Sequence, residues 1–243
     1  VAGEETALLH SMEGLRGAAA ARPPYPAEAG LYGCPTVVNN AETLAAVPWI
    51  VARGGAAYAA RGTDGSSGTK LVCLNERFAR PGVYEVELGT PVRTICEQLG
   101  GGLRDGHTLR SLQVGGPLGG FLGPDELDVP LSFDGLREAG VELGHGGLIA
   151  FDERIAGRDV LRHLWRFAAA ESCGTCVPCS AGTRRGLELA EAIADGAGDG
   201  GVAEMEQILD VMGVASLCGF GQGLPAPVRQ VLRIYAGELG APA

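Results

Sequence analysis

The sequence predicts an α+β protein in which a small β-sheet unit precedes a C-terminal bundle of helices. Alternating, strand-like patterns are confined to residues 66–151, and helical periodicity dominates residues 152–243. Glycine is abundant, with 40 of the 243 residues, which indicates many tight turns. We therefore expect three domains, formed by residues 1–65, 66–151 and 152–243.

Composition narrows the class of protein. The formal net charge is −10, and Lys70 is the only lysine, which argues against a nucleic-acid partner, because phosphate backbones need clustered cations. No apolar run reaches about 18–20 residues, so we expect no membrane span. The first residues lack the features of a secretion signal, which favours a reducing cytosol.

The first region begins with a short acidic helix. A turn at Gly3 precedes Glu4 and Glu5, and acidic residues favour the first turn of a helix. The prolines within Ala21–Pro26 predict extended backbone. The alternative for the two glutamates is that they only stabilise the helix terminus.

A second helix is expected after residue 40. Thr36–Val38 suits a short strand, and Asn39 or Asn40 can cap the following helix. Pro48 should kink this helix or end its first part. Its apolar face contains Leu44, Val47, Ile50 and Val51.

The middle region predicts a unit of β-grasp type. Two strands are expected at Lys70–Leu74 and Val83–Leu88, followed by a helix that starts after Thr90. Further strands are expected at Leu109–Val114 and Leu148–Phe151. A hairpin, a helix and more strands together form such a small α+β unit.

The last region predicts a four-helix bundle. Short connections favour antiparallel packing of four amphipathic segments. Their apolar faces contain Val160, Leu161, Leu164, Phe167 and Ala168; Leu187, Leu189 or Ala190, and Ile193; Met205, Ile208, Leu209 and Met212; and Val228, Val231, Leu232 and Tyr235.

Four of the seven cysteines form one pattern. Cys173, Cys176 and Cys179 lie on a C-x₂-C-x₂-C run, and Cys218 follows after two helical segments. Three thiols on one loop with a distant fourth are typical of a [4Fe-4S] cluster. Structural zinc is the alternative, although zinc sites usually pair two separate knuckles. The remaining cysteines, at positions 34, 73 and 96, are expected to be packed thiols.

The chain also resembles a known family over nearly its whole length. The segments that carry the resemblance are residues 3–8, 30–40, 115–120, 144–147, 171–179 and 216–221. They are similar to the NADH-binding flavoprotein subunit of respiratory complex I (the family of the 51 kDa subunit). The same module occurs as the diaphorase subunit of NAD-linked hydrogenases and formate dehydrogenases.

The resemblance implies both an architecture and a function. Residues 1–65 would end an α/β domain for FMN and NADH, residues 66–151 would form a soluble-ligand-binding β-grasp domain, and residues 152–243 would carry the cluster. Electrons would pass between NAD(H), FMN and a [4Fe-4S] cluster in an NADH dehydrogenase-type complex. The alternative function is that of an NAD-reducing diaphorase subunit in a soluble formate dehydrogenase or hydrogenase. An alternative of a different class is a non-redox interaction module with a structural zinc site formed by four cysteines.

The implied partners are subunits of the same complex. They are a thioredoxin-like [2Fe-2S] subunit and a further iron–sulfur subunit that accepts electrons, together with NADH. The implied location is the cytoplasm, with peripheral attachment to the inner membrane through the complex. Neither nucleic acid nor a direct membrane span is expected.

The resemblance also implies cofactor-binding residues, and it assigns no catalytic side chain. Gly3, Glu4 and Glu5 would lie at the flavin and nicotinamide, and Tyr25 would stack on the adenine. Asn39, Asn40 and Thr43 would hold FMN phosphate or ribityl groups. Helix capping alone also explains the two asparagines.

One departure limits this inference. The family's Gly-rich flavin loop, of the G-R-G-G-A-G type, lies upstream of the Gly-Glu-Glu motif and is absent from this sequence, which also lacks an initiator Met. We therefore expect that the chain is a fragment holding only part of the FMN and NADH site.

Overall fold

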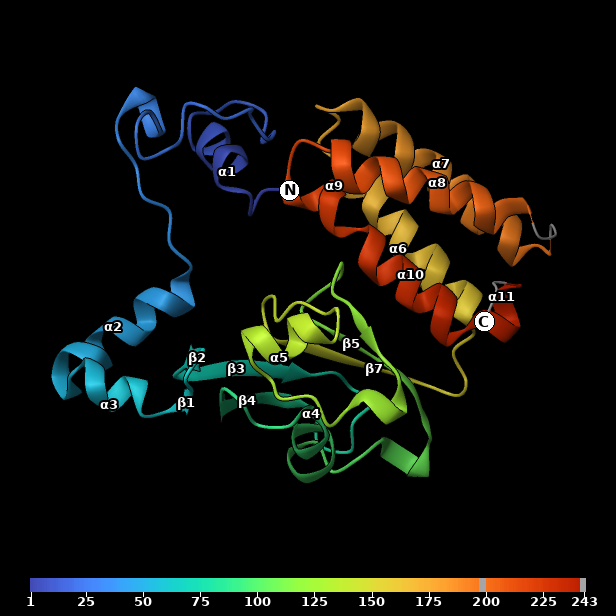
Figure 1. The fold of residues 1–243 in the computed structure, drawn as a ribbon, viewed down its shortest axis with the longest axis horizontal. Coiled ribbons are helices and arrows are strands. Elements are labelled where there is room, and N and C mark those ends of the chain that lie inside the picture. The colour runs from blue at the N-terminus through green and yellow to red at the C-terminus, as the bar shows by residue number, and fades with distance from the viewer. Residues whose placement is uncertain (197–199, 241–243) are drawn as a thin grey trace.

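The computed structural model describes residues 1–196 and 200–240, so residues 197–199 and 241–243 of the predicted helical domain lie outside the described residues. The chain combines a sheet with a group of helices, which confirms the predicted mixture of α and β structure. Figure 1 shows the helices in orange and red on one side of the sheet, with α1 beside the α9 end of the helical group.

A side-chain hydrogen bond caps the start of each of the two N-terminal helices. Helix α1 (Glu5–Met12) follows Glu4, whose carboxylate accepts a 3.0 Å hydrogen bond from the backbone N–H of Ala7. Helix α2 (Ala41–Arg53) follows Asn40, whose side-chain oxygen accepts a 2.8 Å hydrogen bond from the N–H of Glu42. Pro48 lies inside α2 without ending it. The short elements η1 (Leu31–Gly33) and α3 (Gly55–Ala59) complete this region.

The predicted strand at Thr36–Val38 is wrong. The segment has no strand assignment, and the N–H of Thr36 donates to the carbonyl of Pro26 across a turn. A β-branched run forms a strand only when a neighbouring strand supplies hydrogen-bond partners. Val37 is instead 78% exposed.

The central sheet has the strand order β4-β3-β7-β5-β6. Strands β3 and β7 are parallel, and the other neighbouring strands are antiparallel. The strands are β3 (Thr69–Leu74), β4 (Gly82–Glu87), β5 (Leu109–Val114), β6 (Phe121–Leu122) and β7 (Gly147–Asp152). A separate pair joins β1 (Gly62–Thr63) to β2 (Ser66–Ser67).

Short helices cover this sheet and close its core. They are α4 (Val92–Thr94), which continues into the π-helical turn η2 (Ile95–Leu99), then η3 (Arg104–Gly106), η4 (Pro124–Glu126) and α5 (Phe133–Glu138). Val92 and Ile95 are fully buried in the same core as the strands. The four predicted strands of this region are confirmed.

The helical group has its own core. The four predicted helices are present as α6 (Gly157–Glu171), α7 (Val177–Ala194), α8 (Gly200–Ala215) and α10 (Pro225–Ile234). Two short helices, α9 (Gly219–Gly223) and α11 (Ala236–Leu239), were not predicted. Trp165 of α6 is fully buried in this core, and its indole N–H donates to the sulfur of Met205.

Two glycines allow α7 to approach its neighbours. A Cβ on Gly186 would lie 2.2 Å from the Trp165 ring of α6, and a Cβ on Gly182 would lie 2.6 Å from the Met212 sulfur of α8. A larger side chain at Gly186 would therefore overlap the indole ring of Trp165, and one at Gly182 would displace the flexible side chain of Met212.

Polar contacts join the helical group to the sheet. The hydroxyls of Tyr235 and Ser111 lie 2.9 Å apart in a buried contact. Gln230 of α10 accepts a hydrogen bond from the N–H of Phe121 and donates to the carbonyl of Gly140. These contacts fix α10 against the edge of the sheet that β6 forms.

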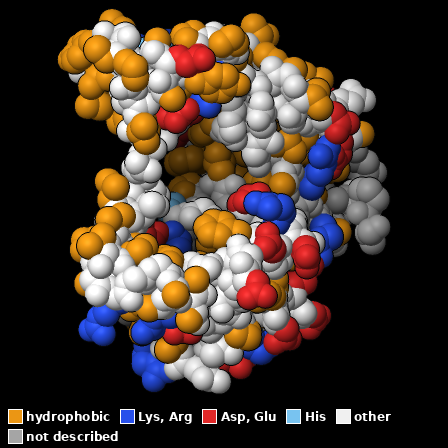
Figure 2. Space-filling view, turned by 60° about the vertical axis from the view of Figure 1, so that its left-hand side comes forward, with side chains coloured by type: hydrophobic (Ala, Val, Ile, Leu, Met, Phe, Trp, Pro, Cys, Tyr) orange, Lys and Arg blue, Asp and Glu red, His pale blue; other side chains and the backbone are white. Residues whose placement is uncertain are grey.

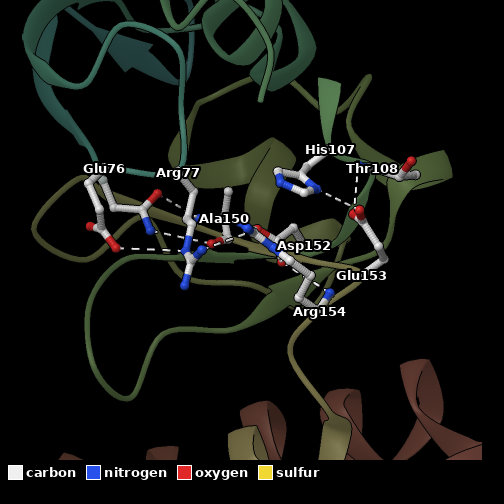
Figure 3. A network of polar contacts seen from close by, with 9 residues as sticks. Glu76, Arg77, His107, Thr108, Ala150, Asp152, Glu153 and Arg154 are labelled. Carbon is white, nitrogen blue, oxygen red and sulfur yellow. Dashed lines mark hydrogen bonds and ion pairs between the residues drawn. The ribbon is translucent and has the colours of Figure 1, made fainter. Parts of the chain in front are cut away.

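A buried carboxylate lies where β7 leads into the helices. Asp152 is 1% exposed and accepts hydrogen bonds from the backbone N–H and guanidinium of Arg154, with Arg77 3.4 Å away (Figure 3). Hydrogen bonds from Arg154 outweigh burial and hold the pKa of Asp152 at about 2. Next to it, Glu153 contacts His107 at 2.7 Å.

No helix in residues 1–196 and 200–240 is both long and apolar enough to cross a membrane.

Replacing Gly186 with alanine should destabilise the helical group. The new methyl group would overlap the Trp165 ring, and overpacking of this kind costs about 1–3 kcal/mol. The free energy of unfolding from urea denaturation measures the effect. Gly237→Ala is the matched control, because no atom lies within 4 Å of its added Cβ, and it should leave stability unchanged or slightly higher.

The ion pairs of Asp152 should make stability depend on pH in the acid range. Because its pKa in the folded chain lies below the ordinary value of 3.8, its contribution is complete above pH 4 and is lost as the pH falls toward 2. Asp152→Asn should therefore flatten the dependence of unfolding free energy on pH between these values. An unchanged slope in urea denaturation series would contradict this assignment.

Candidate metal centre

Four cysteine side chains line one small pocket. Cys173 lies on the loop after α6, Cys176 is the N-cap of α7, Cys179 lies in the first turn of α7, and Cys218 is the N-cap of α9. The pocket has an empty volume of about 240 Å³, and Ser172, Gly174, Leu217 and Phe220 also contribute to its wall. The fold therefore brings the fourth cysteine to the other three across α7 and α8.

The start of α7 favours negative charge in this pocket. Cys176 and Cys179 lie at the N-terminus of an 18-residue helix, where the helix dipole is positive and the first N–H groups have no partner within the helix. A positive helix terminus is in general a favourable place for thiolates, the form in which cysteine binds metals.

Hydrogen bonds reach three of the sulfurs. The N–H of Leu217 donates to the Sγ of Cys176 at 3.4 Å. The hydroxyl of Ser172 lies 3.4 Å from the Sγ of Cys179, and the Sγ of Cys173 lies 3.3 Å from the hydroxyl of Thr175. Such contacts orient cysteine ligands and tune a metal group that they hold.

The thiols differ in their pKa values. Burial raises the pKa of Cys173, but hydrogen bonds from Thr175 and from the N–H of Ala19, together with the charge of Arg16, outweigh it, so that the pKa is lowered. Burial raises the pKa of Cys179, and the neighbouring cysteines raise it further because thiolates repel one another.

The donor set fits an iron–sulfur cluster. Within residues 1–196 and 200–240, no three His, Cys, Asp or Glu side chains are close enough to hold a single metal ion. The four thiols instead surround a pocket. Next to the pocket, Gly221 lies between Cys179 and the side chain of Ser216. The hydroxyl of Ser216 is buried and has no hydrogen-bond partner in the part of the chain that the structure describes. Thiolates around a pocket, with polar groups beside them, are the usual surroundings of such a cluster.

The predicted acidic pair lies at the start of α1. One guanidinium nitrogen of Arg22 lies 2.7 Å from Glu4 and 2.8 Å from Glu5, so a single cation bridges both carboxylates. Burial raises the pKa of Glu4, but hydrogen bonds from Thr6 and the N–H of Ala7, with the charge of Arg22, lower it overall. Gly3 is exposed next to this pair.

The other predicted residues for FMN and NADH lie on other segments of the chain than this pair. Tyr25 is 54% exposed, and Asn39, Asn40 and Thr43 are exposed at the start of α2. Figure 1 shows α1 and α2 at the two ends of an extended connection. Among the described residues, no hydrogen bond or ion pair joins the two groups.

The chain by itself does not enclose a flavin site. A second cavity, with an empty volume of about 500 Å³, lies between α1 and the Pro-rich segment, and none of the seven predicted residues lines it. The face in Figure 2 is hollowed and has hydrophobic side chains spread over it. On α2, Leu44 and Val51 are 55% and 80% exposed. These residues do not fit FMN without further protein around them.

Sequence reasoning missed several contacts of this region. Arg22 and Lys70 carry no motif, yet Arg22 bridges the acidic pair and Lys70 forms an ion pair with Glu42 of α2. Ser172 could have been found, because it directly precedes Cys173 in the cysteine loop. The prediction that cysteines 34 and 73 are packed thiols is wrong, since both are exposed, whereas Cys96 is buried as predicted.

Comparison with known proteins confirms the predicted resemblance. Residues 159–241 match the family described as the NADH-ubiquinone oxidoreductase-F iron-sulfur binding region. The chain is 36% identical over 242 residues to the HndC subunit of the NADP-reducing hydrogenase of Solidesulfovibrio fructosivorans, with 99% of this chain and 49% of that protein covered. It is 39% identical over 241 residues to the F subunit of the NADH-quinone oxidoreductase of Streptomyces coelicolor, with 98% and 53% covered.

A solved structure agrees with these relatives. An NAD⁺-reducing [NiFe]-hydrogenase in the H₂-reduced state matches with a TM-score of 0.89 and 38% identity, over 98% of this chain and 40% of that one. The chain thus spans about half the length of the curated relatives that it matches.

Proposed function

We propose that this chain passes electrons through a [4Fe-4S] cluster held by Cys173, Cys176, Cys179 and Cys218, within an NADH dehydrogenase-type oxidoreductase. The observation that carries the proposal is the convergence of these four thiols on one pocket. The match of residues 159–241 to an iron–sulfur binding region supports it independently.

The cluster would link two kinds of electron carrier. When bound, it takes up and releases single electrons, whereas nicotinamide exchanges a pair as hydride and flavin can exchange either. The chain's own residues would hold the cluster, direct N–H groups at its sulfur ligands and exclude water with Leu217 and Phe220. Gly3, Glu4, Glu5 and Tyr25, with Asn39, Asn40 and Thr43, would contribute to an FMN and NAD(H) site that further protein completes.

The domain assignment follows from this role. Residues 1–65 would complete the flavin domain, residues 66–151 would form a β-grasp domain and residues 152–243 would form the bundle that carries the cluster. The sheet and the helices have largely separate cores, with Phe121 of β6 packed into the helical one, and this supports the division. Among the described residues, neither core includes a residue before Val72, in keeping with a first region that depends on protein beyond it.

The partners would be other subunits of one complex. They would be a thioredoxin-like [2Fe-2S] subunit and a second iron–sulfur subunit that accepts electrons. The chain would then be cytoplasmic, or peripheral at the inner membrane through that complex. A hydrogenase diaphorase is the second candidate, since both HndC and the NAD⁺-reducing hydrogenase are similar to this chain.

Anaerobic reconstitution of the chain with iron and sulfide tests the cluster. The expected product is brown, contains about four irons and four sulfides per chain, and gives an EPR signal on reduction. Cys176→Ser should lose the signal. Cys34→Ser, which alters an exposed cysteine outside the pocket, is the matched control and should keep it. A colourless protein that binds one zinc instead would refute the proposal.

The chain alone should not retain FMN. Most of its predicted flavin residues are exposed, Glu4 and Glu5 are half-buried, and none of them lines the cavity beside α1, so they cannot surround a ring system or exclude water from it. Gel filtration after incubation with excess FMN, followed by absorbance of the protein peak, measures retention. Stoichiometric flavin in that peak would show that this part of the proposal is wrong.

A further inference from the structure

The segment Arg16–Arg22 connects α1 to the Pro-rich stretch and also touches the cysteine pocket. Ala19 is 3% exposed and lines the same pocket as the four cysteines. A terminal nitrogen of Arg16 lies 3.5 Å from the position of a Cβ on Gly174, the residue after Cys173. One side of the pocket is therefore built by residues about 150 positions upstream of the cysteine loop.

The other end of this segment is fixed to the acidic pair. The N–H of Ala20 donates a 2.9 Å hydrogen bond to the hydroxyl of Thr6, and that hydroxyl donates in turn to Glu4. Arg22 bridges Glu4 and Glu5. His10 adds a 2.8 Å contact between its Nδ1 and the carbonyl of Ala18.

These contacts place a cation and a donor beside one cysteine ligand. A [4Fe-4S] cluster with four thiolates becomes more negative when it accepts an electron. A nearby positive charge and N–H groups directed at its sulfurs favour the reduced form and raise the reduction potential. Arg16, next to Gly174 of the cysteine loop, and Ala19, at the wall of the pocket, are placed to supply such groups.

We propose that the segment Arg16–Arg22 sets the reduction potential of the cluster and links that potential to the Glu4–Glu5 pair. Arg16 and Ala19 act as positioning residues at the cysteine loop, and Thr6 and Arg22 hold the segment in place from the acidic pair. This inference rests on the proposed cluster. It adds a part of the N-terminal region to the cluster site.

The first test is an EPR-monitored redox titration of the reconstituted chain. Arg16→Gln should shift the midpoint potential to a lower value, because a cation beside the cysteine loop is lost, and Arg16→Lys should restore most of the shift. Arg158→Gln is the matched control: it removes an exposed arginine from α6 and should leave the midpoint unchanged. An unaltered midpoint in Arg16→Gln with full iron content would overturn the inference.

The second test addresses the link to the acidic pair without changing charge. Thr6→Val removes the acceptor for the N–H of Ala20 and should shift the midpoint in the same direction, whereas Thr6→Ser should keep the parent value. Iron content and far-UV circular dichroism establish that each variant is folded and loaded. A parent-like midpoint in Thr6→Val would refute the link.

The two hypotheses fail in different ways. If the unmodified chain gives no cluster signal, the proposed function fails. If the signal is present but insensitive to Arg16→Gln and Thr6→Val, only the role of the segment fails.

Discussion

The structure depends on bringing four like-charged sulfur ligands to one pocket from two separate turns. Three cysteines share a short loop, but Cys218 must return to them after α7 and α8. This return requires that α7 pack closely against both α6 and α8. Gly186 and Gly182, one helical turn apart, provide the necessary space, the first against Trp165 and the second against Met212. The helical core therefore contributes to the geometry of the pocket as well as to stability, because α7 and α8 connect the cysteine loop to Cys218.

The N-terminal region follows a different constraint. Helix α2 buries none of its residues, although its pattern is amphipathic, and it is attached to the sheet through the contacts of Glu42 with Lys70 and with the N–H of Leu71. A helix with an exposed apolar stripe is stabilised mainly by what packs against that stripe. The exposed apolar face of α2 and the exposed Asn40 and Thr43 at its start are therefore features of one region that buries little apolar surface.

Most of the secondary structure and the set of four cysteines could be predicted from the sequence, because the spacing of residues along the chain reflects local structure. The four long helices and the four main strands follow from apolar spacing, and the cysteine pattern follows from ligand spacing. The predictions of secondary structure failed where the conformation of a segment depends on residues far away in the sequence or where the segment is very short. The β-branched run at Thr36–Val38 had no strand to pair with, and helices as short as α9 and α11 carry too few residues for a period to be visible. Strand alternation also exposes Cys73, because Val72 and Leu74 occupy the buried face.

The contact between Arg16–Arg22 and the cysteine loop belongs to the same class of unpredictable features, and it has a geometric consequence. Only Ala20 and Ala21 separate Ala19, at the pocket wall, from Arg22, at the acidic pair. An extended chain rises at most about 3.6 Å per residue, so these two points are within roughly 11 Å of each other along the chain. Their proximity to each other is thus set by covalent geometry. Packing sets the distance from the acidic pair to the four cysteines, because Ala19 meets the cysteine loop across about 150 positions of sequence. A displacement of the acidic pair would therefore be carried over three residues to the wall of the pocket.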